Sequence, residues 1–276
     1  LAAFEAARAK CRVFERLFSR TLAHSDVARI NNAHGARVDI SADTADLIEA
    51  ALRYCEASEG LFDITIGRAV ALWNFHEGII APDDKLKAAL AHVNWKTVHV
   101  ERDARGAHAY LDDPDAALDL GGIAKGWMAD RLTELLEGEG LRDFIVNLGG
   151  NVVVRGEKPN GQPWRVGLQD PFAKDGVVGS VALKDASAVT SGTYERSFVH
   201  DGRVYHHILD PKTGFPVDTD AAGVTVITKK SVDAEGYSTT LLALGVERGL
   251  AFASTRPEIL NVHFVDHDRQ IKSLKS

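Results

Sequence analysis

The stretch Asp119-Leu-Gly-Gly-Ile-Ala-Lys125 places two glycines at the entry of a predicted helix over residues 123–136, and a lysine in the first turn of that helix. The start of a helix offers unpaired backbone N–H groups and the positive end of its dipole, and glycine lets an anion approach closely. The stretch therefore suits a phosphate or pyrophosphate. The spacing of a P-loop is absent. The same residues would also occur in a strand-to-helix turn that has no ligand and a solvated lysine.

Outward from this stretch, predicted helices and strands come in blocks rather than in strict alternation. Further helices are predicted over 1–20, from an N-cap at Ser41 to near Gly60, and over 83–92, 233–244 and 247–254. Strands are predicted at 98–100, 116–119, 164–168, 177–183, 195–200, 204–209 and 222–228, with hairpins over 143–155 and 260–274. Because most neighbouring strands are joined as hairpins, we expect an α+β fold of mostly antiparallel sheets packed with helices, in one compact domain over 1–276.

The composition restricts the class of protein. The 276 residues are 45% hydrophobic and 26% charged, which is typical of a globular protein. The net charge of −7 and the lack of any basic run argue against a nucleic-acid binder. No apolar stretch reaches the length of a membrane span. The chain opens on Leu1 within a helical pattern, so we expect any export signal or membrane tether to precede it.

The two cysteines, Cys11 and Cys55, do not form a C-x-x-C pair, which argues against a structural zinc site or a redox dithiol. Both lie in apolar helical patterns. We expect buried free thiols, with a disulfide between them as the open alternative.

Two histidines stand at the end of a predicted strand in Tyr205-His-His-Ile-Leu-Asp-Pro-Lys-Thr-Gly214. Adjacent strand residues point to opposite faces, so at most one of them faces a given site. The segment from Asp210 to Gly214 is a good turn sequence without any function, but this does not explain the histidines. A histidine facing a pocket could act as a general base near neutral pH.

A carboxylate and a hydroxyl share one face of the predicted helix over 233–244, because Glu235 and Thr239 are four residues apart. Such hard oxygen ligands suit Mg²⁺, although an exposed Glu/Thr pair is more often simply solvated.

Two further segments have plain structural interpretations. Gly60-Leu-Phe-Asp-Ile-Thr65, followed by Trp73 and Phe75, combines a glycine turn, an apolar strand and two aromatics that are more often core than ligand contacts. Val189-Thr-Ser-Gly-Thr-Tyr-Glu-Arg196 crowds hydroxyls around a glycine and reads as a polar turn between strands.

Taken in order, these segments resemble the ApbE family of FAD:protein FMN transferases over nearly the whole chain. The matching pieces are Ser25-Asp-Val-Ala-Arg-Ile-Asn31, Gly60–Thr65 with Trp73, Asp119–Gly126, Asn147-Leu-Gly-Gly150, Thr190-Ser-Gly192 with Tyr194, His206–Gly214 and Leu241-Leu-Ala-Leu-Gly245.

The resemblance implies that FAD binds in a cleft with Mg²⁺ against its pyrophosphate, and that FMN passes to a Ser or Thr hydroxyl of a target protein while AMP leaves. It implies FAD contacts at Glu59, Gly60, Asp119, Lys125 and Ile208. The implied metal ligands are the Gly122 carbonyl, Glu235 and Thr239, and the implied base is His207.

The chain departs from the family pattern at two places. Glu235 stands where the family normally has Asp, and the extra methylene matters because Mg²⁺ tolerates poor geometry badly. Asp233 is a substitute ligand whose offset from Thr239 fits less well. We also expect that the N-terminal strand of the family, which contributes a flavin contact, is missing before Leu1.

The sequence is also compatible with two other activities. An FAD pyrophosphatase would use the same metal and cleft with water in place of the protein hydroxyl, and a flavin-binding protein would keep the cleft with little catalysis. The resemblance implies an acceptor that is a redox-complex subunit or a flavin-dependent reductase, with a short motif carrying Thr or Ser. It implies a location at the outer face of the cytoplasmic membrane, with the cytosol as the alternative.

Overall fold

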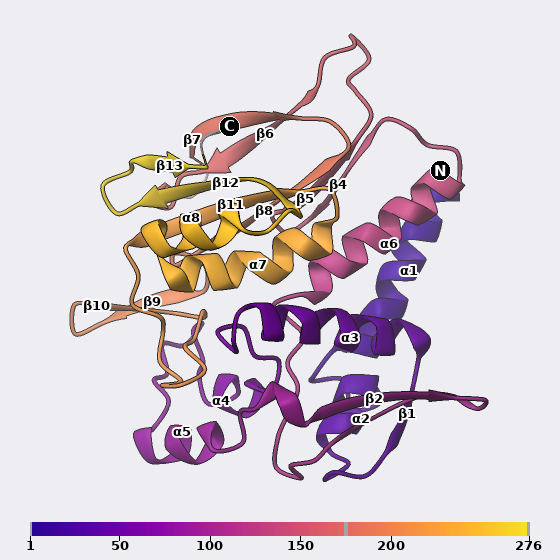
Figure 1. The fold of residues 1–276 in the computed structure, drawn as a ribbon, viewed down its shortest axis with the longest axis vertical. Coiled ribbons are helices and arrows are strands. Elements are labelled where there is room, and N and C mark those ends of the chain that lie inside the picture. Colours follow the sequence, from indigo (N-terminus) through magenta and orange to yellow (C-terminus); the bar gives the residue numbers. More distant parts are fainter. Residues whose placement is uncertain (1, 174–175, 275–276) are drawn as a thin grey trace. The chain divides into compact units, whose positions relative to one another are not determined.

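The computed structural model describes residues 2–173 and 176–274, which form two compact units (Figure 1). Unit 1 contains the described residues of 2–7, 125–196 and 217–274, and unit 2 contains residues 8–124 and 197–216. Each unit combines helices with antiparallel strands. The predicted α+β class is therefore confirmed.

The described part of the chain contains the following elements, with labels as in Figure 1. The helices are α1 (Ala2–Phe18), α2 (Asp26–Asn31), α3 (Ala42–Ala57), α4 (Gly67–Val70), α5 (Asp83–Leu90), the 3-10 helix η1 (Trp95–Thr97), α6 (Ala124–Gly138), α7 (Ser231–Leu244) and α8 (Val246–Ser254). The strands are β1 (Val38–Ile40), β2 (Val98–Asp103), β3 (Gly106–Leu111), β4 (Phe144–Leu148), β5 (Asn151–Arg155), β6 (Trp164–Gln169), β7 (Val177–Leu183), β8 (Ala186–Gly192), β9 (Ser197–His200), β10 (Arg203–His206), β11 (Ala221–Thr228), β12 (Ile259–Asp266) and β13 (Ile271–Ser273).

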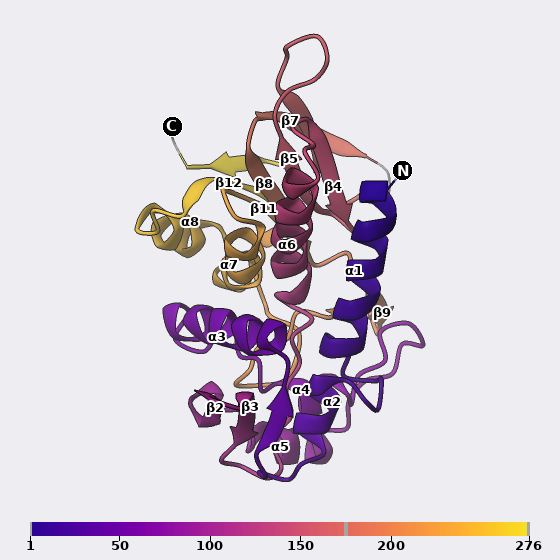
Figure 2. The ribbon, with the colours of Figure 1, turned by 90° about the vertical axis from the view of Figure 1, so that its right-hand side faces the viewer.

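The centre of unit 1 is a six-stranded antiparallel sheet with the order β13-β12-β11-β8-β5-β4. All eight residues of β11 are buried, as expected for a strand covered on both faces. Helix α7 packs against β8 and β11, and α8 packs against β12 (Figure 2). The apolar runs of β11 and β12 thus form the core beneath these helices.

The alternation of side chains along β8 shows what covers each face of the sheet. Ser187 and Ser191 point to α7, where their hydroxyls bond to those of Ser231 and Ser238 at 2.9 Å each. Ala186 and Ala188 point the other way, into an apolar cluster that includes residues of the β6–β7 hairpin. Strand β8 therefore has a polar face toward α7 and an apolar face toward the hairpin.

The β4–β5 hairpin turns through two glycines, as the sequence predicts. Leu148 pairs with Asn151, and Gly149 and Gly150 between them have φ values of +59° and +91°. Two consecutive positive φ values suit a tight hairpin turn and strongly favour glycine. The turn makes Asn151 the first residue of β5.

Helix α7 receives its N-terminal cap from another helix. The carboxylate of Asp130, on α6, accepts hydrogen bonds from the backbone N–H groups of Ser231 (2.7 Å) and Val232 (2.9 Å). Burial raises the pKa of Asp130 to about 6, although these two N–H groups oppose the shift. The bonds satisfy two of the free donors at the helix start and tie α6 to the beginning of α7.

Unit 2 contains a three-stranded antiparallel sheet in the order β1-β3-β2, against which α3 packs. Helix α3 begins where predicted, because the Ser41 hydroxyl accepts a hydrogen bond from the backbone N–H of Thr44 at 3.0 Å.

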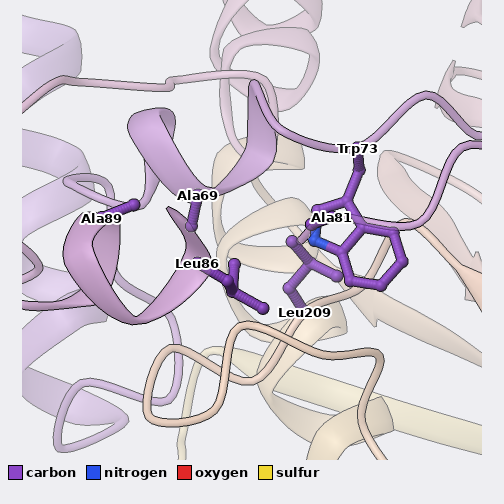
Figure 3. Packing of buried hydrophobic residues seen from close by; sticks show 6 residues of the cluster. All are labelled: Ala69, Trp73, Ala81, Leu86, Ala89 and Leu209. Atoms are coloured by element: carbon purple, nitrogen blue, oxygen red, sulfur yellow. The ribbon is translucent and has the colours of Figure 1, made fainter. Parts of the chain in front are cut away.

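Trp73 lies in a cluster of buried apolar residues in unit 2, with Ala69, Ala81, Leu86, Ala89 and Leu209 (Figure 3). Its ring stacks on Phe75 with centroids 5.5 Å apart, and its indole N–H donates to the carbonyl of Gly214 at 3.1 Å. The aromatic pair is thus core, as the structural interpretation of the sequence predicted. It also fixes the turn that follows the two histidines.

Two strands and one turn predicted from the sequence are wrong. Residues 116–119 form only a single bridge, between Ala117 and Ile66, and residues 60–65 form turns. Both segments are held by loop contacts: the backbone N–H of Asp119 donates to the carbonyl of Ile64 at 2.8 Å, and Asp63 accepts from the N–H and hydroxyl of Thr65 at 2.8 and 2.6 Å. Conversely, the first half of the segment over 189–196 belongs to β8, because its hydroxyls find partners on α7 and β11.

Both cysteines are free thiols, so the alternative of a disulfide between them is wrong. Cys55 is buried, which raises its pKa to about 12, whereas Cys11 is half-buried. Within residues 2–173 and 176–274, no helix is both long and apolar enough to span a membrane.

Candidate functional site

In unit 1, a buried carboxylate meets a lysine and an asparagine. Glu235, on α7, is only 4% exposed. Its Oε1 pairs with the ammonium of Lys125 in the first turn of α6, and its Oε2 accepts a hydrogen bond from the Nδ2 of Asn151 at 2.5 Å. Both oxygens of this carboxylate are therefore held by donors, as a buried charge requires. Lys125 keeps 40% of its side chain exposed and can reach an anion in solvent.

Gly126 explains how the two helices come this close. A Cβ at this position would lie 2.6 Å from the Cβ of Glu235 and 2.6 Å from the carbonyl oxygen of Ser231. Neither atom is the end of a flexible side chain, so any larger residue would push α6 and α7 apart. The last glycine of the stretch over 119–126 thus sets the contact between Lys125 and Glu235.

Replacing Gly126 with alanine should therefore destabilise the protein by about 1–3 kcal/mol, the usual range for overpacking. Gly138→Ala is the matched control, because it also lies on α6 and nothing stands within 4 Å of its added Cβ. We expect the control to be neutral or to stabilise by up to about 1 kcal/mol. Urea unfolding of both variants measures the difference, and equal unfolding free energies would contradict the packing argument.

Thr239 follows Glu235 by one turn of α7 and is half-buried. The carboxylate and the hydroxyl are oxygen donors on one helix face, and this donor set fits a hard divalent cation. Asp233 is half-buried in the first turn of α7.

A second acidic group near Lys125 was missed by the sequence interpretation. Burial raises the pKa of Glu195, the charge of Lys125 opposes that shift, and the charge of Glu235 adds to it. Glu195 therefore lies within the electrostatic reach of the Lys125–Glu235 pair. Its position just after β8, in the segment read as a polar turn, gave no separate signal.

In unit 2, Asp119 is held at the entry to α6. Its Oδ1 accepts from the backbone N–H of Gly121 at 2.8 Å, and its Oδ2 lies 3.3 Å from the Nε of Arg20. The side chain of Asn31 accepts from the backbone N–H of Leu118 at 2.7 Å and donates to its carbonyl at 2.9 Å; Leu118 directly precedes Asp119. The motif ending at Asn31 thus fixes the strand-like segment that carries Asp119, and Arg20 adds a charge that the sequence interpretation did not include.

The other predicted contacts of unit 2 lie in turns. Glu59 is exposed, and both it and Gly60 have positive φ values, of +54° and +82°. Gly60 lies beside the indole of Trp95, and Gly122 lies beside the ring of Phe62.

The two histidines at the end of β10 differ in exposure, as strand alternation predicts. His206 is buried at 5% exposure and His207 is half-buried. Ile208, which follows, is buried at 5% exposure. The backbone N–H of Gly214 donates to the carbonyl of Asp210 at 2.7 Å, so the turn predicted after the histidines is present.

The predicted site residues thus form two sets. Unit 1 brings together Lys125 and Glu235, with Thr239 one helical turn further on. Unit 2 carries Glu59, Gly60, Asp119, Gly122, His207 and Ile208.

A separate group of His92, Asp113 and Asp115 has ligand atoms within 4.8 Å of one another. His92 already contacts Asp113 at 2.8 Å, and Asp115 contacts Arg68 at 3.2 Å. These contacts account for the group as partly exposed polar contacts in unit 2.

Comparisons with known proteins show which family this chain resembles. Residues 2–264 match the profile of the ApbE family. The FAD:protein FMN transferase of Klebsiella pneumoniae is 37% identical over 262 residues, covering 94% of this chain and 80% of that protein. The FAD:protein FMN transferase of Treponema pallidum is 34% identical, covering 94% of this chain and 75% of that protein.

Solved structures show the same fold. The ApbE protein of Thermotoga maritima superposes with a TM-score of 0.88 at 31% identity, covering 98% of this chain and 88% of that one. The flavinyl transferase ApbE of Pseudomonas stutzeri superposes with a TM-score of 0.85 at 29% identity, covering 99% and 85%. With a family profile matching nearly its whole length and relatives above 30% identity, this chain belongs to the ApbE family.

Proposed function

We propose that this chain is an FAD:protein FMN transferase that uses Mg²⁺ to move FMN from FAD to a Thr or Ser hydroxyl of an acceptor protein, releasing AMP. Its relatives carry the name of this enzyme. The single structural observation that supports the proposal best is the Lys125–Glu235 pair, in which a half-exposed ammonium stands beside a buried carboxylate.

Lys125 has the charge to bind the pyrophosphate of FAD. Its ammonium lies in the first turn of α6, where the free N–H groups of the helix start add a positive potential. Asp119 and the turn at Glu59 and Gly60 are the further proposed contacts to FAD, with Ile208 as an apolar one. These groups bind and orient the donor, and positioning contributes a large part of catalysis in phosphoryl transfer.

Glu235 and Thr239 are the proposed protein ligands of Mg²⁺, together with the carbonyl of Gly122. When bound, the ion would neutralise charge on the pyrophosphate and on the leaving phosphate. The observed donors fit this use, because a carboxylate and a hydroxyl one helical turn apart are hard oxygen ligands.

His207 is the proposed general base. Its imidazole would take the proton from the acceptor hydroxyl as that oxygen bonds to the phosphorus on the FMN side. The bond from this phosphorus to the bridging oxygen breaks, and AMP leaves with that oxygen. The products are an FMN phosphoester on the acceptor, AMP and one proton.

Mass spectrometry of products tests the proposal. The purified protein is incubated with FAD and Mg²⁺, with and without a Thr-containing acceptor peptide. A peptide that gains the mass of FMN while AMP accumulates would support the transferase. Free FMN and AMP in both reactions would instead identify a pyrophosphatase, and intact FAD that stays bound would identify a flavin-binding protein.

A further inference from the structure

Glu235 lies at the end of a buried chain of hydrogen bonds. Asn151 is 1% exposed; its Nδ2 donates to Glu235, and its Oδ1 accepts from the hydroxyl of Ser231 at 2.6 Å. The Ser231 hydroxyl lies 2.9 Å from that of Ser187, which is also 3.1 Å from the carbonyl of Val152. Residues of β5, β8 and α7 thus contribute to one polar chain inside unit 1.

The chemistry of this chain fixes the direction of the asparagine amide. A carboxylate only accepts hydrogen bonds, so the NH₂ of Asn151 must face Glu235. Its carbonyl oxygen must then face Ser231, whose hydroxyl can donate. The amide has one arrangement that satisfies both neighbours, and reversing it would leave two buried groups without partners.

Three features of the fold place Asn151 at this point. The Gly149–Gly150 turn makes it the first residue of β5, and its pairing with Val189 directs its side chain to the α7 face of the sheet. Asp130 holds the N-terminus of α7 by the backbone of Ser231, which leaves the Ser231 hydroxyl available for Asn151.

We infer that Asn151 is a positioning residue for the metal-binding carboxylate: it holds Oε2 of Glu235 so that Oε1 stays on the side of Lys125. A glutamate has one more rotatable bond than an aspartate, and ordering that bond has an entropic cost. The hydrogen bond from Asn151 offsets it. Partners that orient a metal ligand in this way typically change metal affinity 10–100-fold. The inference rests on the proposed function, in which Glu235 is a metal ligand.

The test is a double-mutant cycle on metal affinity. Mn²⁺ replaces Mg²⁺, ADP supplies a pyrophosphate that cannot be transferred, and the signal of free Mn²⁺ in electron paramagnetic resonance measures binding. We expect Asn151→Ala to weaken Mn²⁺ binding 10–100-fold. In a Glu235→Ala background the same change should alter binding by less than about twofold, because residues acting through one contact are not additive.

Two hydroxyl variants complete the experiment. Ser231→Ala removes the donor to Asn151 and the hydroxyl partner of Ser187, but it keeps the Asn151 amide beside Glu235, so it should weaken Mn²⁺ binding less than Asn151→Ala does. If Asn151→Ala does not fold, the Mn²⁺ affinity of Ser231→Ala tests the inference instead. Ser231→Ala should fold, because Asp130 caps α7 through the backbone N–H of residue 231, which the substitution keeps. Thr225→Val is the matched control, because it removes another buried hydroxyl of the same sheet. That hydroxyl bonds to Thr190 at 2.8 Å and is not part of the hydrogen-bond chain that ends at Glu235. Its Mn²⁺ affinity should be unchanged.

The outcomes separate the two hypotheses. If Glu235→Ala weakens Mn²⁺ binding but Asn151→Ala and Ser231→Ala do not, the positioning role is wrong and the proposed metal site stands. An equal loss from Asn151→Ala with and without Glu235 also overturns the positioning role. If Glu235→Ala itself leaves the affinity unchanged, the metal assignment fails and the inference fails with it.

Discussion

Replacing His207 with alanine should lower the rate of FMN transfer by about 10²–10⁴-fold, the usual contribution of a general base. The affinity for FAD should change little, because His207 is not itself a proposed FAD contact and the substitution leaves the side chain of the neighbouring contact, Ile208, unchanged. The variant should fold, since His207 is half-buried whereas the apolar packing at this point involves its buried neighbours His206 and Ile208. Transfer rates by mass spectrometry, with FAD binding followed by flavin fluorescence, measure both quantities.

His200→Ala is the matched control for this prediction. His200 lies on the same β9–β10 hairpin, but its side chain is 55% exposed, and its imidazole contacts the carboxylate of the neighbouring Asp201. We expect its transfer rate to stay within about twofold of the unmodified protein. A His207→Ala variant that transfers FMN at full rate would show that another group takes the proton of the acceptor.

Glu235→Ala should reduce Mg²⁺-dependent transfer about a thousandfold. A metal ion contributes several kcal/mol to stabilising charge in the transition state, and each 1.4 kcal/mol is a factor of ten. The change also leaves Lys125 without its partner and removes the acceptor of the buried Asn151 amide. The rate as a function of Mg²⁺ concentration is the measurement, with the free energy of unfolding as the check on folding.

Glu235→Asp distinguishes a missing ligand from a badly placed one. Aspartate is the residue that the resemblance to the family implies at this position, so turnover should rise if the extra methylene of Glu235 limits metal binding. The contacts of Glu235 with Lys125 and Asn151 favour the opposite result, because the shorter side chain of aspartate would draw the carboxylate away from both partners. No change in turnover would show that the length at this position does not limit the reaction.

Much of the fold followed from local sequence. The Ser41 cap, the Gly149–Gly150 turn and the apolar spacing of α1 act over a few residues, so their patterns can be read directly. The predicted position of the histidine pair at the end of a strand is also confirmed, since β10 ends at His206. The segment over 189–196 resembles a polar turn in the sequence, but residues 189–192 belong to β8. The hydroxyls of Thr190 and Ser191 bond to side chains 35 and 47 residues away along the chain, which no local pattern shows.

For the site, the sequence determined which chemical groups are present: Lys125 at a helix start, Glu235 and Thr239 on one helix face, and a histidine pair at a strand end. These are local facts, set by the periods of helix and strand. Only the tertiary structure placed Lys125 on Glu235, across 110 residues, and Asn151 against the same carboxylate, across 84. Those contacts depend on the close approach of α6 to α7 at Gly126 and on the register of β5 against β8. Such distances are decided by packing, which joins segments whose separation no local pattern encodes.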